Sequence, residues 1–477
     1  MPLSSANKTG LIAAMDKIAA KRDKYIRRSS HYYDNLVRFF RFCIPENSKV
    51  LEIGCGTGYL LNAVKPAYGV GIDISPMMVG IAKGKYPHLH FMEQDAEYLE
   101  LDEKFDYIII SDTLGYLEDI QKLFIRLKSV CTPATRILIN YHSFLWEPFL
   151  SLAQSLKLKM PHKRLNWLNR SDVVNLLNLE GFEVIKTGRR YLMPFYIPVI
   201  SWLFNKYIAH LPLLNSLCLT GYIIARLPEQ LPSGNREFTV SVIIPARNEE
   251  GNIEDAVKRV PDMGKHTEII FVEGGSSDNT LNEIKRVCGK WQDQRDVKYF
   301  VQTGKGKGDA VRLGFNNASG DILMILDADL TVAPEDLNKF YDAIATGRGE
   351  YINGTRLVYP MEDEAMRTLN MMGNKFFSVM FSWILGQRIK DTLCGTKVIS
   401  APNYKKLIHN RSYFGNFDPF GDFDLIFGSA KLNLKLVEVP IRYRARTYGA
   451  TNISRFSHGW LLIRMMFYAM NKIKFLH

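Results

Sequence analysis

The feature that most constrains the fold is a repeated alternation of short apolar runs with segments long enough to form helices. A first series contains KVLEIG, GVGID, LHFME, FDYIIISD and RILINY, and a second contains TVSVIIPA, EIIFVEGG, VKYFVQTG and DILMILDAD. Buried strands that alternate with helices are typical of parallel sheets covered by helices. The sequence therefore predicts an α/β fold.

A stretch rich in proline, glycine and polar residues, LPEQLPSGNREF, separates the two series and favours a linker. A chain of 477 residues also exceeds the size of one ordinary core. We expect a basic helical N-terminal extension, an α/β domain, the linker, a second α/β domain and an amphipathic C-terminal helix. Their expected bounds are 1–48, 49–227, 228–237, 238–456 and 457–477.

The composition favours a folded protein with reduced thiols. Hydrophobic residues make up 47% and charged residues 23% of the chain, and the six cysteines are dispersed without a C-x-x-C pair. This pattern predicts neither a disulfide framework nor a zinc site. The net charge of +12 suits phosphate-bearing partners or an anionic membrane surface. Without zinc-finger spacing or an RNP-type motif, we expect no nucleic-acid partner.

Three glycines follow the first strand of the first series, in VLEIGCGTGYLL. Gly54, Gly56 and Gly58 lie between a strand and an apolar helix, where glycine permits a tight turn and close approach of a ligand. The spacing is G-x-G-x-G, whereas the dinucleotide fingerprint would place its third glycine at Tyr59. Asp73 ends the next strand, where a carboxylate can accept hydrogen bonds from ribose hydroxyls, and Asp95 follows the third.

These motifs, with Glu52 and the strand FDYIII, resemble class I S-adenosylmethionine-dependent methyltransferases over about residues 30–227. The resemblance implies a Rossmann-like sheet and S-adenosylmethionine as cofactor. The cofactor-binding residues that it implies are Glu52, Gly54, Gly56, Gly58, Asp73, Asp95 and Ala96. His142, just past a strand, is a candidate general base, and a loop histidine without a chemical role is the alternative. Asp112 and Tyr116 lie near the expected cofactor rim without a catalytic assignment.

An apolar insertion, residues 191–216, precedes the last strand of the first half and is interrupted by Pro194, Pro198 and Lys206. In one interpretation, this insertion has a functional role: it lines an apolar acceptor pocket or lies in a membrane interface. Ordinary packing against the sheet is the alternative.

Two carboxylates, Asp327 and Asp329, end the apolar run DILMILDAD in the second half. Oxygen ligands at the end of a parallel strand suit hard divalent cations. A cation there can bridge the phosphates of a nucleotide-sugar and stabilise the departing diphosphate. A helix-capping or turn pair is the alternative.

The segments SVIIPARNEEGNI, VEGGSSDNT, GKGDAVRLGF and DADL occur in an order that resembles family-2 glycosyltransferases of the GT-A fold. KDTLCGTKVIS and VEVPIRYRARTYGATNISRF are similar to the branch that contains dolichol-phosphate mannose synthase and dolichyl-phosphate glucosyltransferase. The resemblance covers about residues 238–456. It implies inverting sugar transfer that depends on Mn²⁺ or Mg²⁺ held by Asp327 and Asp329.

Carried over by position, the resemblance places a nucleotide-sugar site at the carboxyl ends of the second series of strands. Its residues would be Pro245, Arg247, Asn248, Glu249, Glu273, Asp278, Lys305, Lys307, Arg312, Asp327 and Arg356. Glu273 replaces the usual aspartate and Gly274 a second acidic residue, so the donor stays open between UDP- and GDP-linked sugars.

The acceptor side is rich in cations. A phosphomonoester, with a second pKa of about 6, is already an anion at neutral pH and needs cations rather than a base. Candidate cations are Arg356, Lys397, Arg442, Arg444 and Arg446. Asp424 would orient the acceptor, or Asp424 or Asp422 would be the base for a hydroxyl acceptor. The predicted catalytic set is Asp327, Asp329, Asp424, Arg444 and Arg446.

Residues 365–386 and 459–477 are apolar with interspersed basic residues, as in helices that lie in a membrane interface; a buried helix or dimer contact is the alternative. No secretory signal and no run of ~20 apolar residues is present. We therefore expect a cytoplasmic, bifunctional enzyme, peripheral on the inner face of the cell membrane. It would transfer a hexose to a polyprenyl phosphate or lipid-linked acceptor and methylate in the same pathway. The alternative is a sugar-to-sugar glycosyltransferase with a non-catalytic cofactor- or membrane-binding module.

Overall fold

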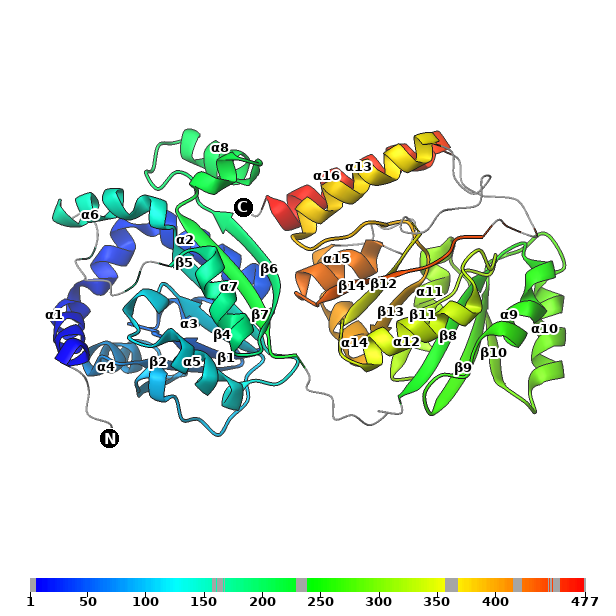
Figure 1. The fold of residues 1–477 in the computed structure, drawn as a ribbon, viewed down its shortest axis with the longest axis horizontal. Helices are drawn as coiled ribbons and strands as arrows, with labels where there is room; N and C mark the ends of the chain where they lie inside the picture. Colours follow the sequence, from blue (N-terminus) through cyan, green and yellow to red (C-terminus); the bar gives the residue numbers. More distant parts are fainter. Residues whose placement is uncertain are drawn as a thin grey trace. The chain divides into compact units, whose positions relative to one another are not determined.

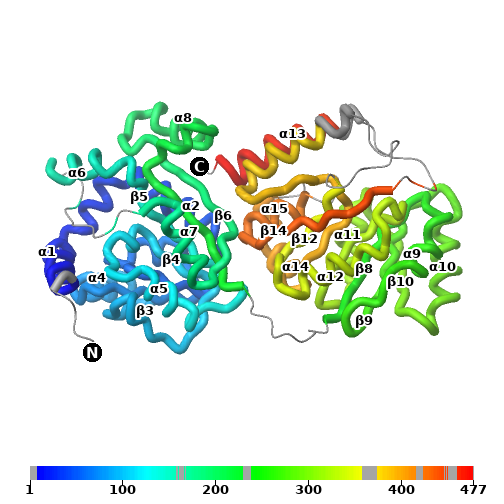
Figure 2. The backbone as a smooth tube through the Cα atoms, viewed as in Figure 1, coloured from blue at the N-terminus to red at the C-terminus, as the bar shows by residue number. Residues whose placement is uncertain are grey.

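The computed structural model describes residues 6–156, 160, 166, 168–228, 238–356, 368–414, 423–444, 446, 448 and 455–475. The chain divides into two compact units: unit 1 is Met1–Glu229 with Phe475–His477, and unit 2 is Gln230–Lys474. Each unit contains one seven-stranded sheet with helices packed on it (Figures 1 and 2). The predicted pair of α/β domains is confirmed. The expected linker lies, apart from residue 228, outside the described residues.

The sheet of unit 1 has the strand order β3-β2-β1-β4-β5-β7-β6. Strands β1 to β5 are parallel to one another, and β7 runs antiparallel between β5 and β6. The direction of winding reverses between β1 and β4, which is the place where open α/β sheets bind ligands. The strands are β1 Lys49–Ile53, β2 Tyr68–Asp73, β3 His90–Glu93, β4 Tyr107–Ser111, β5 Arg136–His142, β6 Glu183–Arg190 and β7 Thr220–Arg226.

The helices of unit 1 begin with the segment expected to be an N-terminal extension, which forms α1 and α2 of this unit. Helix α2 buries an aromatic face that includes Phe39, Phe40 and Phe42, so it is part of the core. The helices are α1 Ala6–Arg28, α2 Ser30–Cys43, α3 Tyr59–Ala63, α4 Pro76–Lys85, α5 Ile120–Leu127, α6 Glu147–Ser155, α7 Arg170–Leu179 and α8 Ile200–Lys206.

The sheet of unit 2 has the order β10-β9-β8-β11-β13-β12-β14, in which β13 is antiparallel to β11 and to β12. Its central strand β11 is buried at every residue, because β8 and β13 flank it, and it ends two residues before Asp327. The strands are β8 Thr239–Ala246, β9 His266–Glu273, β10 Asp296–Val301, β11 Ile322–Ile325, β12 Tyr351–Thr355, β13 Lys397–Ser400 and β14 Leu436–Pro440.

Two long helices of unit 2, α13 and α16, pack side by side (Figure 1). Within the described residues, no helix is both long enough and apolar enough to cross a membrane. The helices are α9 Ile253–Arg259, α10 Thr280–Trp291, α11 Lys307–Asn316, α12 Leu337–Ala345, α13 Thr368–Leu385, α14 Ala401–His409, α15 Phe423–Lys431 and α16 Arg455–Ala469.

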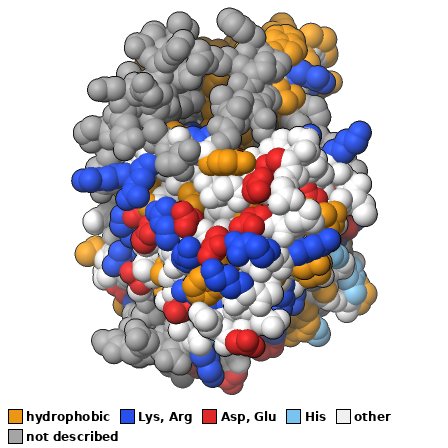
Figure 3. All heavy atoms as spheres, turned by 90° about the vertical axis from the view of Figure 1, so that its right-hand side faces the viewer, with side chains coloured by type: hydrophobic (Ala, Val, Ile, Leu, Met, Phe, Trp, Pro, Cys, Tyr) orange, Lys and Arg blue, Asp and Glu red, His pale blue; other side chains and the backbone are white. Residues whose placement is uncertain are grey.

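The face of unit 2 that carries α9 and α10 mixes basic and acidic side chains (Figure 3). Glu254 forms ion pairs there with Lys258, Arg286 and Lys290. Opposite charges on this face therefore balance one another locally.

Candidate functional site

A cavity of about 610 Å³ lies in unit 1 at the carboxyl edge of its parallel strands. Cavities of roughly 300–1,000 Å³ are the usual size of small-molecule sites. Its walls include most of the residues predicted to bind the cofactor, namely Glu52, Gly54, Gly56, Asp73, Asp95 and Ala96. The structure thus brings together side chains from the ends of three neighbouring strands.

The glycine loop needs its glycines. Gly54, Gly56 and Gly58 have φ values of 74°, 53° and 75°, in the left-handed region that side chains disfavour. A Cβ on Gly54 would also collide with the Thr113 side chain. The Gly56 N–H donates to Asp73 Oδ2 over 2.8 Å, so the carboxylate at the end of β2 holds the loop in place.

Two carboxylates, the half-buried Asp73 and the buried Glu52, support this loop. Burial raises the pKa of Asp73, although Ser75 and Gly56 donate backbone hydrogen bonds to it. Burial raises the pKa of Glu52 to about 8, and its Oε2 accepts from the Leu61 N–H over 2.9 Å. Both groups therefore have loop-holding contacts in addition to their place on the cavity wall.

Asp95, which the sequence predicts to contact the adenine, forms an ion pair with Lys8 of helix α1. Its Oδ2 lies 2.5 Å from Lys8 Nζ, and its Oδ1 accepts from the Glu97 N–H over 3.0 Å. Lys8 also pairs with Glu97 over 2.8 Å. An adenine at Asp95 would therefore meet this ion pair.

Helix α1 also forms hydrogen bonds with the glycine loop and with the loop after β2, which we call the cofactor loops. Asp16 accepts from Ser75 Oγ over 2.5 Å, and Asp23 accepts from Thr57 Oγ1 over 2.9 Å. The Arg22 side chain lies against the glycine loop, because a Cβ on Gly56 would fall 2.6 Å from Arg22 Nε. That Nε is buried and has no hydrogen-bond partner among the described residues.

Lys8 and Arg22 are cavity residues that the sequence analysis did not single out. Both belong to a segment of scattered basic residues, KTGLIAAMDKIAAKRDKYIRR, which looks like a solvated helix. No local spacing distinguishes a basic side chain that faces a cavity from one that faces water.

A polar network closes the cavity at the ends of β4 and β5. His142 Nδ1 lies 2.7 Å from Asp112 Oδ1. Tyr32 of α2 donates to Asp112 Oδ2 over 2.8 Å, and Asn140 donates to Asp112 Oδ1 over 3.2 Å. The three side chains Tyr32, Asp112 and His142 all line the cavity.

The apolar insertion exposes many of its large side chains. Phe195 is 64% exposed, Tyr196 70% and Leu213 88%, and on α6 Phe149 is 61% exposed. Phe195 and Tyr196 also line the cavity. In the structure these side chains are not packed into the core of unit 1.

The acidic pair of unit 2 is held by cations. Asp327 Oδ1 lies 2.5 Å from Lys307 Nζ, and Asp329 Oδ2 accepts from Arg446 Nη2 over 2.8 Å. Burial alone would raise the pKa of Asp327, but Lys307, Lys397 and Arg356 outweigh it, and the pKa is lowered. Both carboxylates therefore lie in a positive environment.

Two neighbours fix the geometry of the acidic pair. Thr331 donates to Asp329 Oδ1 through its N–H over 3.1 Å and through its hydroxyl over 2.8 Å. A Cβ on Gly395 would collide with the Asp327 carboxylate, so a side chain at that position would displace this carboxylate.

Arg446 joins the end of β8 to the end of β11. Besides Asp329, it binds Glu249 Oε1 over 3.0 Å, and Asn252 donates to Glu249 Oε2 over 2.8 Å. Burial raises the pKa of Glu249 against the effect of Arg446. The structure thus brings three of the predicted site residues into direct contact.

Three other residues predicted to contact the nucleotide hold loops. Asn248, at φ 58°, accepts from the Ser277 N–H over 2.8 Å. Glu273 accepts from the Ser276 N–H over 2.6 Å, and Asp278 from the Thr280 N–H over 3.0 Å. Other members of the predicted set lie on β8, on α11 and in the adjoining loops: Pro245, Arg247, Lys305 and Arg312.

Three predicted acceptor-side residues have strong partners of their own. Arg356 forms a double hydrogen bond to Asp391, over 2.7 and 2.9 Å. Asp424 pairs with Arg411 over 2.8 Å. The buried Lys397 donates to the Cys394 carbonyl. Asp422 lies outside the described residues.

Arg444 lines a hollow of about 580 Å³, and its N–H donates to the Thr331 carbonyl over 2.9 Å. This cationic hollow is lined by Arg259, Ala333, Glu335, Asp336, Lys339, Arg442 and Arg444. Arg259 pairs with Glu335 and Lys339 with Asp336, and Arg442 and Arg444 add two further positive charges, so the hollow favours an anion.

Comparison with known proteins identifies both units. Residues 23–187 match the family model of a methyltransferase domain, and residues 241–411 match that of glycosyl transferase family 2. Solved structures with similarity include an S-adenosylmethionine-dependent methyltransferase of Thermotoga maritima, at 15% identity and a TM-score of 0.36, covering 45% of this chain and 99% of that one. Glucosyl-3-phosphoglycerate synthase of Mycobacterium tuberculosis matches at 19% identity and a TM-score of 0.37. The match covers 51% of this chain and 86% of that one.

Curated relatives match the second half. Glycosyltransferase AglJ of Haloferax volcanii is 27% identical over 47% of this chain and 69% of its own length. Undecaprenyl-phosphate 4-deoxy-4-formamido-L-arabinose transferase of Edwardsiella ictaluri is 26% identical over 44% of this chain, which spans only 61% of that relative. Dolichyl-phosphate beta-glucosyltransferase of Saccharomyces cerevisiae is 28% identical over 44% of this chain and 68% of its own length. The chain therefore carries a methyltransferase domain followed by a family-2 glycosyl transferase domain.

Proposed function

We propose that the glycosyl transferase domain moves a hexose from a nucleotide-sugar to a polyprenyl phosphate or a related lipid-linked acceptor. The observation that carries this proposal is the acidic pair after β11, bound by Lys307 and Arg446. Relatives named as undecaprenyl-phosphate and dolichyl-phosphate sugar transferases support the choice of acceptor. The methyltransferase domain would use S-adenosylmethionine to methylate a compound of the same pathway.

A divalent cation would take the places of Lys307 and Arg446 on the acidic pair, and these side chains would then be available to the phosphates. Within the described residues, no group of three or more metal-ligating side chains gathers, but Mg²⁺ sites often use one or two carboxylates with substrate phosphates. A carboxylate has about four acceptor positions, and Asp329 uses three in its bonds to Thr331 and Arg446. Asp327 and Asp329 would hold Mn²⁺ or Mg²⁺, which supplies charge neutralisation for a departing diphosphate.

The cations of the chain would position the phosphates. Lys307 and Arg446 lie against the carboxylates where a diphosphate would arrive, and charge-assisted bonds to phosphate oxygens are strong. The cationic hollow with Arg442 and Arg444 offers a place for the phosphate of the acceptor. That phosphate is already anionic near neutral pH, so it needs cations and no base.

We also propose a peripheral position on the inner face of the cell membrane. On α13, Phe376 is 51% and Val379 62% exposed, and on α16 Trp460 is 64% and Phe467 55% exposed. Apolar side chains on one pair of helices, in a chain of net charge +12, suit an interface with anionic lipids. Co-sedimentation with anionic vesicles, lost when Trp460 and Phe467 are both changed to serine, tests this position.

Binding of UDP- and GDP-sugars in the presence of Mn²⁺ tests the donor side of this proposal. The binding is measured as a gain in stability against thermal unfolding. A ligand at about 100 times its Kd stabilises the domain by about 2.7 kcal/mol. We expect this gain for one nucleotide class, its loss in Asp329→Asn, and its retention in Asp293→Asn, which changes an exposed aspartate. Equal binding by wild type and Asp329→Asn would contradict the proposal.

A further inference from the structure

We propose that His142, held by Asp112, is the general base of the methyltransferase domain and that the group it deprotonates is a neutral hydroxyl of the methyl acceptor. This inference rests on the proposed methyl transfer and deepens it by naming the chemical class of the acceptor. The observation behind it is the 2.7 Å contact between His142 Nδ1 and Asp112 Oδ1 inside the cofactor cavity.

The fold places these two residues together. Strands β4 and β5 are parallel neighbours with Ser111 opposite Asn140, so the residues that follow emerge at the same edge of the sheet. Asp112 turns there at a φ of 55°, which is uncommon outside glycine, and its N–H donates to the Asn140 carbonyl over 2.9 Å. Uncommon backbone conformations of this kind gather at functional sites.

The surroundings keep Asp112 in the role of an acceptor. Tyr32 donates to its Oδ2 over 2.8 Å and Asn140 to its Oδ1 over 3.2 Å. Burial, together with Asp112, raises the pKa of Tyr32 well above its usual range, so the phenol stays a donor. With Asp112 as acceptor, the Nδ1 of His142 carries the proton, and the neutral ring has its lone pair on Nε2.

The base shares its cavity with the cofactor loops. His142, Asp112 and Tyr32 line the same 610 Å³ space as Gly54 and Asp73. A base and the predicted methyl donor site thus open into one chamber. Phe195 and Tyr196, at its wall and largely exposed, provide an apolar side along which an amphiphilic acceptor can enter.

The need for a base excludes acceptors that are already anions, and the hexose of the proposed pathway offers hydroxyls. A carboxylate or phosphate acceptor is already an anion near pH 7, whereas a hydroxyl must lose its proton during attack. The proton moves from the hydroxyl oxygen to His142 Nε2, and the imidazolium is stabilised by Asp112. The oxygen electron pair forms the bond to the methyl carbon, and the carbon–sulfur bond pair stays on sulfur. The product is a methyl ether.

The first test reads the tautomer and needs no acceptor. The full chain, labelled with ¹⁵N-histidine and saturated with S-adenosylhomocysteine, is observed by NMR, and His142 is assigned from the signal lost in His142→Gln. We expect the proton on Nδ1 in wild type and its shift toward Nε2 in Asp112→Asn. A proton on Nε2 in wild type would overturn the proposal even if methyl transfer were found.

The second test measures methyl transfer from labelled S-adenosylmethionine to a polyprenyl-phosphate hexose. We expect His142→Gln to lower kcat by about 10²- to 10⁴-fold with S-adenosylhomocysteine affinity retained. The matched control His88→Gln, which changes an exposed histidine of the same unit, should stay active. An unchanged kcat in His142→Gln, or an alkali-labile methyl ester as product, overturns the proposal. If wild type transfers no methyl group to this lipid, the polyprenyl-phosphate hexose is not the acceptor. The NMR tautomer of His142 then decides whether His142 can act as the base.

Discussion

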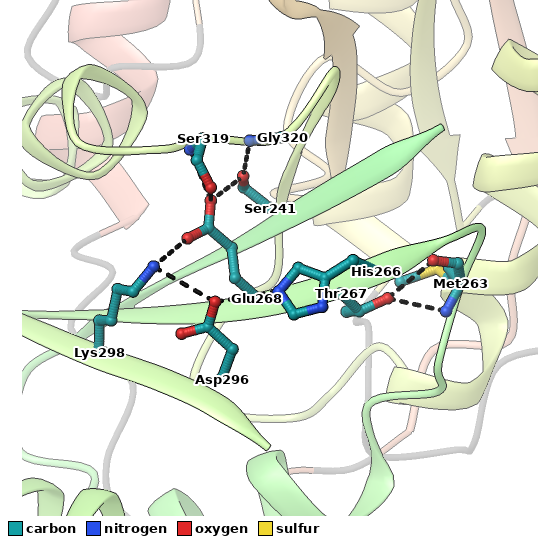
Figure 4. A network of polar contacts seen from close by, with 9 residues as sticks. All are labelled: Ser241, Met263, His266, Thr267, Glu268, Asp296, Lys298, Ser319 and Gly320. Carbon is teal, nitrogen blue, oxygen red and sulfur yellow. Dashed lines mark hydrogen bonds and ion pairs between the residues drawn. The ribbon is translucent and has the colours of Figure 1, made fainter. Parts of the chain in front are cut away.

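Glu268 of β9 offers a quantitative test of the packing in unit 2. Its carboxylate is buried and accepts from Ser241 Oγ, from the Ser319 N–H over 2.6 Å and hydroxyl over 2.9 Å, and from Lys298 Nζ over 2.8 Å (Figure 4). Burial alone would raise its pKa, but Lys298, Ser241 and Ser319 lower it from 4.5 to about 2. The ionised form is therefore strongly favoured in the folded state.

The magnitude follows from linkage. One pKa unit corresponds to about 1.36 kcal/mol, so a fall from 4.5 to about 2 stabilises the fold by about 3 kcal/mol. Because the pKa is depressed on folding, this stability is fully present above about pH 4.5. It is lost as the pH falls toward 2.

The perturbation is Glu268→Gln, which keeps the shape and removes the charge. We expect the variant to lose about 3 kcal/mol at pH 7 and the difference from wild type to shrink between pH 4.5 and pH 2. Because the chain has two units, unfolding in urea is monitored by hydrogen exchange of peptides from β8 and β9. These peptides report on unit 2 alone.

The control is Lys298→Met. The Lys298 side chain is 44% exposed, so water screens the pair, and we expect a smaller loss than for Glu268→Gln because the Ser241 and Ser319 hydrogen bonds remain. A Glu268→Gln effect of equal size at pH 7 and pH 3 would refute the reasoning, because only the ionised carboxylate is stabilised.

Three further predictions concern single residues. Asp391→Asn leaves the Arg356 guanidinium buried without its carboxylate and should cost about 3–5 kcal/mol in urea unfolding of unit 2; a loss under 1 kcal/mol would contradict a buried pair. Gly54→Ala should abolish S-adenosylhomocysteine binding in calorimetry because of its φ of 74°, while Gly84→Ala, with open space around it, should bind normally. Arg22→Met should weaken that binding about 10- to 100-fold, since a charged hydrogen bond contributes about 1.5–3 kcal/mol; unchanged affinity would place Arg22 outside the site.

Local patterns were enough to predict strands β1 to β5 and β8 to β11 and the residues at their ends. The glycine loop at Gly54 and the acid at Asp73 follow from strand–turn–helix punctuation, and both line the cavity. The acidic pair at Asp327 follows from charge placed after a buried strand. In each case neighbours in sequence determine the conformation, so a short window contains the information.

Pairings between distant segments were not predictable in this way. The bidentate partner of Arg356 is 35 residues away at Asp391, and Arg446 reaches Asp329 across 117 residues. The insertion of β7 between β5 and β6 likewise depends on a strand that comes last in its unit. Such contacts are selected by the packing of the whole unit, and residue spacing carries no signal for them.

The ties between α1 and the cofactor loops bear on how this domain can be shortened. A protein trimmed at residue 23, where the methyltransferase family match begins, would retain the glycine motif but lose Lys8, Asp16 and Arg22. Asp95 would lose its ammonium neighbour, and one wall of the chamber would open to water. Truncation at the family boundary would thus yield a domain with its signature sequence intact and its ligand compartment breached.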